Sequence, residues 1–150
     1  MRLPTFSIAT MKTLSALIVA ATVFAAQPVI AQESPAVAAA KVSADAWLKR
    51  VDTADYAGSW ETSAASMRSE MSKSSWKMLI TALHWPLGDF KSRKFKSAVL
   101  QKAPAGKPGP DQVIIDYVSQ YENKADVKET VTTTLEKDNS WKVSGFNING

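Results

Sequence analysis

The chain has 150 residues, a formal net charge of +4 at pH 7 and no cysteine. This length provides for one domain with one hydrophobic core. The lack of cysteine excludes disulfide bonds, thiol nucleophiles, thiolate-ligated metal sites and dithiol redox chemistry.

The apolar run at residues 14–26 indicates a secretory signal. Lys12 precedes it, and the small residues Val29 and Ala31 follow it in the order that marks a cleavage site. The run has thirteen residues, whereas a membrane span needs about 20. We therefore expect residues 1–31 to be a cleaved signal peptide of a bacterial protein that is periplasmic or secreted. No stable membrane anchor is expected after cleavage.

Removal of the signal peptide takes away Arg2 and Lys12 and leaves a net charge of +2. The remaining chain has one local basic cluster, formed by Lys91, Arg93, Lys94 and Lys96. Such a cluster either binds an anionic group or forms the solvated face of a strand, and the solvated face is favoured. No nucleic-acid partner is expected, because the cluster is short and export separates the protein from most nucleic acid.

Residues 32–42 are rich in alanine and contain Pro35, and we expect them to form a flexible lead into the fold, with a helical end as the alternative. Ser43 is a suitable N-cap for a first helix, because its hydroxyl can accept hydrogen bonds from first-turn amides. The apolar residues after it recur at the spacing of one helical face. They are Ala44, Trp47, Leu48 and Val51.

Two more helices are predicted before Pro86. Asp55 can cap the first of them, and Ser72 can cap the second. The first carries Tyr56, Trp60, Met67 and Met71. The second carries Trp76, Leu79, Ile80 and Leu83. Pro86 prevents this last helix from continuing much past His84.

After Gly88 the apolar period changes from about four residues to two, which predicts β-strands. The alternating segments are residues 94–99, 113–122, 130–135 and 141–148. Asp138 and Asn139 are typical of a tight hairpin turn, and residues 103–110 form a longer loop rich in Pro and Gly. The alternation shifts by one residue at Gly145, which predicts a β-bulge.

This order of elements predicts an α+β fold. Three N-terminal helices are expected to pack on one face of a curved four-stranded antiparallel sheet. The arrangement resembles the cystatin-like and ketosteroid-isomerase-like cone folds, which host enzymes, binding proteins and inert scaffolds alike. Residues 43–150 are expected to form this single domain.

Three motifs resemble those of a known family. They are an opening with Trp47-Leu48, Asp52, Asp55-Tyr56 and Ser59-Trp60, a junction Pro86-Leu87-Gly88 followed by Arg93, and a closing Trp141-x-Val143-x-Gly145-Phe146. In this order and spacing the chain resembles the bacterial domain-of-unknown-function family numbered 4019. The resemblance implies a small exported domain without an assigned activity. The chain departs from the family pattern at Trp85, where an Arg is usual nearby.

His84 and Asp116 are candidate acid/base residues. His84 is the only histidine and ends a predicted helix, whose dipole stabilises a protonated imidazole. Asp116 lies in a predicted strand, and a carboxylate that faces a pocket can act as a base. A structural role is favoured for both residues. No metal site or cofactor is expected, because His84 has no neighbouring ligand and no phosphate-binding glycine loop is present.

The aromatic residues offer a candidate ligand site. The residues predicted to bind a ligand are Tyr56, Trp60, Trp76, Arg93 and Tyr117. Aromatic residues at helical spacing are more often part of the core. For Arg93 an ion pair with Glu129 across the sheet is favoured over an anion site, because a half-buried Arg usually has a partner.

The sequence predicts a noncatalytic exported module that binds a small apolar ligand or a protein partner. A first alternative is a small acid/base enzyme of the isomerase, dehydratase or hydrolase type. This alternative requires His84 and Asp116 to open into one enclosed cavity. A second alternative is a dimeric scaffold that pairs through the outer face of the sheet, where Thr130, Thr132 and Thr134 form a flat polar surface.

Overall fold

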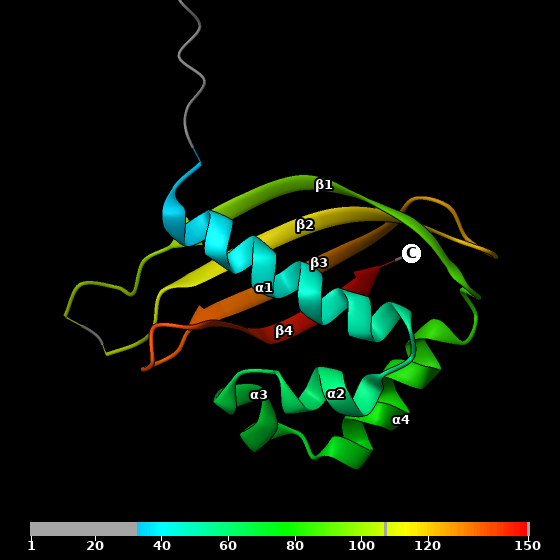
Figure 1. Cartoon of the computed structure of the whole chain (residues 1–150), viewed down its shortest axis with the longest axis horizontal. Helices are drawn as coiled ribbons and strands as arrows, with labels where there is room; N and C mark the ends of the chain where they lie inside the picture. Colours follow the sequence, from blue (N-terminus) through cyan, green and yellow to red (C-terminus); the bar gives the residue numbers. More distant parts are fainter. Residues whose placement is uncertain (1–32, 107, 150) are drawn as a thin grey trace, which may run out of the picture. The chain divides into compact units, whose positions relative to one another are not determined.

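The computed structural model describes residues 33–149 with the exception of residue 107. The predicted signal peptide, residues 1–31, lies outside the described residues. Four helices come first in the described chain and four strands follow them, which confirms the predicted α+β fold (Figure 1). No helix within the described residues is both long and apolar enough to cross a membrane.

Helix α1 (Pro35–Asp52) begins nine residues earlier than the sequence pattern predicts. The hydroxyl of Ser34 caps it by accepting from the Val37 amide, and Pro35 occupies the first turn, where its missing N–H costs nothing. Val37 and Ala40 are buried in the core. The prediction of a flexible lead over residues 32–42 is therefore wrong from Pro35 onward, whereas the helical end of this segment is confirmed.

Helices α2 (Tyr56–Glu61) and α3 (Ala65–Glu70) replace the single helix predicted for this region. The break occurs where the amide of Ala64 donates to the carbonyl of Val143, 2.7 Å away, and so leaves the helical hydrogen-bond pattern. Asp55 and Ser72 cap α2 and α4 (Lys73–His84) as predicted.

The sheet consists of β1 (Phe90–Gln101), β2 (Gln112–Tyr121), β3 (Val127–Leu135) and β4 (Trp141–Asn149). Its order is β1-β2-β3-β4, and every neighbouring pair is antiparallel. The predicted hairpin turn is confirmed, with Asn139 in the left-handed region at a φ of 62°. The register shift between β3 and β4 lies next to Gly145, as expected for the predicted bulge.

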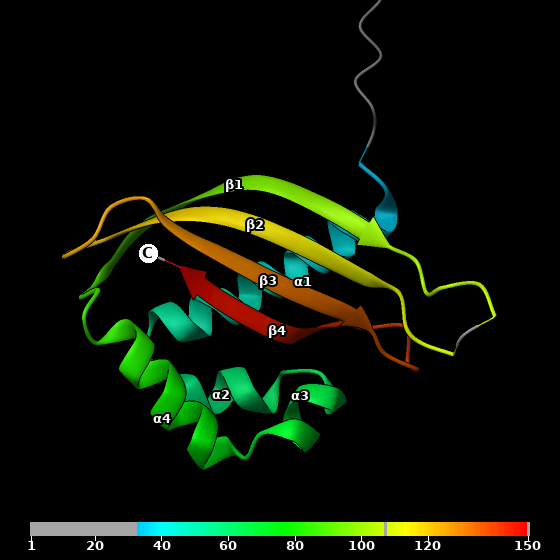
Figure 2. The ribbon, with the colours of Figure 1, turned by 180° about the vertical axis from the view of Figure 1, so that it is seen from behind.

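Among the described helices, only α1 lies across the sheet, where it contacts all four strands (Figures 1 and 2). Helices α2, α3 and α4 lie beside the edge strand β4 instead of on the sheet face, so the helical layer differs from the one predicted. The core joins these parts through Trp47 of α1, Trp76 of α4 and Phe146 of β4. Their ring centroids are 5.6 Å (Trp47–Trp76) and 5.4 Å (Trp47–Phe146) apart.

The opposite, outer face of the sheet is covered by no helix among the described residues (Figure 2). Thr130 and Thr132 are half-buried there, and Thr134 is buried. Thr130 donates to Asp116 on the neighbouring strand, at 2.8 Å. Dimer formation through this face stays a prediction.

Candidate functional site

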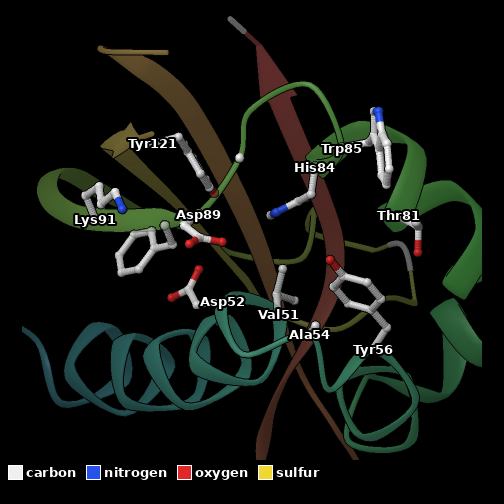
Figure 3. Close-up of a pocket in the computed structure, with 12 residues that line it drawn as sticks. Val51, Asp52, Ala54, Tyr56, Thr81, His84, Trp85, Asp89, Lys91 and Tyr121 are labelled. Atoms are coloured by element: carbon white, nitrogen blue, oxygen red, sulfur yellow. The ribbon is translucent and has the colours of Figure 1, made fainter. Parts of the chain in front are cut away.

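A hollow of about 440 Å³ opens where α4 ends and β1 begins (Figure 3). We call it the His84 hollow. Its walls come from the end of α1, the start of α2, the end of α4, the turn before β1, and strands β1 and β2. The lining residues that bear on its chemistry are Asp52, Tyr56, His84, Trp85, Asp89, Phe90, Lys91 and Tyr121.

The local sequence explains this geometry. Pro86 follows the last turn of α4 and ends the helix at His84 and Trp85. Gly88 then takes a φ of +72°, which redirects the chain into β1. A side chain at Gly88 would also meet Asn123, because a Cβ there would lie 2.8 Å from its Nδ2. The turn therefore places His84 and Phe90 in the walls of the same hollow, six positions apart in the sequence.

His84 lies between two tyrosine rings in the hollow. Its ring centroid is 6.3 Å from that of Tyr56 and 5.6 Å from that of Tyr121, both in edge-to-face arrangements. Its Nε2 atom is buried and has no hydrogen-bond partner among the described residues. Figure 3 shows the imidazole pointing toward the side of the hollow where Asp89 and Tyr121 lie. Burial lowers the pKa of His84 below its usual 6.5, although the carboxylates of Glu129 and Asp52 oppose this shift.

Behind the hollow lies a partly buried ion cluster centred on Arg93. Its guanidinium donates to both carboxylate oxygens of Asp52, at 2.8 and 2.9 Å, and it also binds Glu129. Glu129 has no exposed surface and accepts further hydrogen bonds from Ser119, at 2.6 Å, and from Tyr121. The predicted pair of Arg93 with Glu129 is thus confirmed, and Asp52 makes it a triad.

These contacts set the charge states of the cluster. Burial acts to raise the pKa of Glu129, but hydrogen bonds from Arg93, Ser119 and Tyr121 outweigh it and keep the pKa below its usual value. Burial also raises the pKa of Tyr121, and the adjacent Glu129 carboxylate raises it further. The tyrosine therefore stays neutral and keeps donating to Glu129.

The sequence prediction missed Asp52 as a partner of Arg93. A signal was present, because Asp52 follows Leu48 by four residues and so continues the buried stripe of α1. A carboxylate on a buried stripe needs a cationic partner. Arg93 is the partner that the sheet brings to it.

Trp60 and Trp76, two of the predicted ligand-binding residues, do not line the hollow. Trp76 is buried in the core, and its indole N–H donates to Ser59 Oγ at 2.9 Å. Trp60 packs at the edge of the core and donates to the Met71 carbonyl at 2.8 Å. Helical spacing placed these rings toward neighbouring helices, so the alternative that they belong to the core is the correct one. Tyr56 does line the hollow.

Arg93 and Tyr117, the other two predicted ligand-binding residues, line a neighbouring hollow of about 460 Å³. Tyr117 lies on the inner sheet face, and its hydroxyl donates to Asp45 of α1 at 2.8 Å. Asp52 and Phe90 belong to the walls of both hollows. The predicted set of ligand residues is thus divided among two hollows and the core.

Asp116 lies on the outer face of the sheet, opposite to His84. It accepts hydrogen bonds from Ser97 at 3.1 Å and from Thr130 at 2.8 Å. Strand alternation puts its neighbour Tyr117 on the inner face. The structure does not bring His84 and Asp116 into one cavity, so the acid/base pair that the enzyme alternative requires is absent.

Residues 43–146 match the family described as a protein of unknown function, DUF4019. The chain belongs to this family. The matched range of DUF4019 contains every residue that lines the His84 hollow. The family carries no assigned activity, and no curated protein matches the chain.

Proposed function

We propose that the protein is an exported, noncatalytic binding module whose site is the His84 hollow and whose ligand is a small molecule with an apolar body. The observation that carries the proposal is the His84 side chain. It combines a buried polar atom that lacks a partner with aromatic walls on both sides, in an open hollow. Ligand sites are mostly apolar concavities in which a few polar groups fix orientation.

The state of the nearby carboxylates supports binding over catalysis. A general base must be free to take a proton from the substrate. Asp52 and Glu129 are both held by Arg93, and Glu129 also has two hydroxyl donors. Asp89 is exposed at the rim. The hollow therefore lacks a desolvated carboxylate that is free to act on a substrate.

A variant that fills the hollow tests the proposal. Ala54 lines the hollow, so Ala54→Trp should occlude it. We expect small aromatic and aliphatic molecules that shift the imidazole resonance of His84 in the wild-type protein to lose at least tenfold in affinity for this variant. The resonance is unambiguous, because the chain has one histidine.

The matched control is Ala82→Trp, which places the same ring on an exposed position of α4 outside the hollow. This control should retain wild-type affinity. A library of small molecules that leaves the His84 resonance unchanged in the wild-type protein would overturn the proposal. Equal affinity of both variants for a bound molecule would also overturn it.

A further inference from the structure

We infer that the ligand of the His84 hollow is an organic cation, a quaternary ammonium or a protonated amine with an apolar body. This inference rests on the proposed binding function and names the chemical class of its ligand. Two independent features carry it, which are the aromatic rings of the hollow and the sign of the charges around it.

The aromatic rings form a continuous arc. Phe90 contacts Tyr121 at a centroid distance of 5.8 Å, Tyr121 contacts His84, and His84 contacts Tyr56. Trp85 adds a large indole at the mouth of the hollow, and 85% of the surface of this residue is exposed. A cation within about 6 Å of such ring faces is attracted by their quadrupoles. One face of Phe90 is already covered by the Arg93 guanidinium, which lies 4.5 Å from the ring centroid.

The charges around the hollow add to this attraction. Asp52 and Asp89 are part of its walls, as is the single lysine Lys91. Glu129 lies directly behind Tyr121 and accepts a hydrogen bond from its hydroxyl. Arg93 carries one positive charge, so it neutralises only one of the two carboxylates that it binds, Asp52 and Glu129. Three carboxylates thus face two cationic side chains, which gives the site a net charge of −1.

This negative site stands out against the rest of the chain. The full sequence has a net charge of +4, and residues 32–150 keep +2. The local excess of carboxylate is therefore a property of the hollow and not of the composition. A neutral His84 adds no opposing charge at pH 7, since burial disfavours its protonated form. An anionic ligand would meet the carboxylates, and a neutral ligand would gain nothing from them.

A pair of probes of equal shape separates charge from apolar contact. The alcohol 3,3-dimethylbutan-1-ol has the shape of choline, but a carbon atom replaces the quaternary nitrogen and the molecule is uncharged. We expect choline to bind at least tenfold more tightly, measured by titration of the His84 imidazole resonance and by calorimetry. This ratio is the expected size of a cation–π contact that is assisted by a nearby carboxylate.

Two charge variants give opposite expected signs. Asp89→Asn removes an attracting charge and should weaken choline binding about threefold to tenfold. Lys91→Gln removes a repelling charge and should strengthen choline binding by about threefold. Neither side chain makes a hydrogen bond or ion pair within the described residues. The binding of 3,3-dimethylbutan-1-ol should not respond to either change. Asp116→Asn on the outer sheet face and Lys96→Gln at an exposed position of β1 both lie outside the hollow. They serve as controls and should leave choline binding unchanged.

The outcomes distinguish the inference from the proposed function. Equal affinity for the two probes would overturn the cation inference and leave the binding function standing. Failure of choline to shift the His84 resonance would also overturn it, whereas the proposed function falls only if the wider library fails as well. Responses of the same sign in the Asp89 and Lys91 variants would show that charge does not determine binding.

Discussion

Glu129 is a fully buried carboxylate that stays ionised because donors surround it. Arg93, Ser119 and Tyr121 all donate to it, and Arg93 is in turn shared with Asp52. Breaking such a pair leaves a buried charge without compensation, which typically costs 3–5 kcal/mol. The sequence predicts the pair of Arg93 and Glu129, since both lie at strand starts. It does not show which side chains complete it, because those contacts depend on how α1 crosses the sheet.

His84 makes stability depend on pH near neutrality. The folded protein lowers the pKa of His84 below 6.5, so the unfolded chain binds more protons as the pH falls. Asp52, Glu129 and Arg93 are the charged groups that act on it. We therefore expect the free energy of unfolding, measured with urea, to decrease as the pH is lowered from about 7 to 5.

His84→Asn removes the titrating group and should flatten this part of the pH profile. A second loss of stability, at lower pH, should persist in the variant. It arises because Glu129 has a depressed pKa, so its stabilisation is present above about pH 4.5 and lost as the pH falls through the folded pKa. An unchanged slope between pH 7 and 5 in His84→Asn would contradict the assignment.

At the scale of elements, period and capping residues predicted most of the strands and helix starts. The change from a period of four to two located the sheet, and Asp55 and Ser72 located two helices. The early start of α1 was missed because alanines were interpreted as a lead, although Ser34 followed by Pro35 is an N-terminal capping signal. The break between α2 and α3 depends on a hydrogen bond to β4, which local sequence does not encode.

The turn between α4 and β1 gives a test at this scale. Gly88→Ala should destabilise the protein by about 1–3 kcal/mol, because a left-handed φ disfavours a side chain and the new Cβ meets Asn123 and Glu122. Gly106→Ala is the matched control, since Gly106 has a φ of +77° but open space around it. Urea unfolding should show the larger loss for Gly88→Ala. Equal losses would mean that the close approach contributes nothing.

At the scale of the whole molecule, the sequence predicted the fold class and the family but not the site. The hollow is assembled from residues that lie between positions 51 and 121, and no local pattern connects them. His84 and Tyr56 were named as candidates, yet for different sites. Their meeting with Tyr121 follows from the placement of α4 beside the edge of the sheet, which only tertiary packing determines.

The export proposal has a test of its own. The described fold begins at the Ser34 cap of α1, so cleavage after Ala31 would leave that cap and Pro35 intact. We expect protein isolated from its bacterial host to start at Gln32, as read from intact mass and N-terminal sequencing. A mass that includes residues 14–26 would contradict cleavage. A start beyond Pro35 would mean that α1 loses its cap on maturation.

The triad of Asp52, Arg93 and Glu129 has a consequence for folding. Arg93 lies 41 residues after Asp52 and 36 residues before Glu129. A partly assembled chain that buries one member without the other two leaves an ion stranded in an apolar interior, so such intermediates are penalised. We therefore expect helix α1 and the distant strands β1 and β3 to unfold together in one cooperative transition.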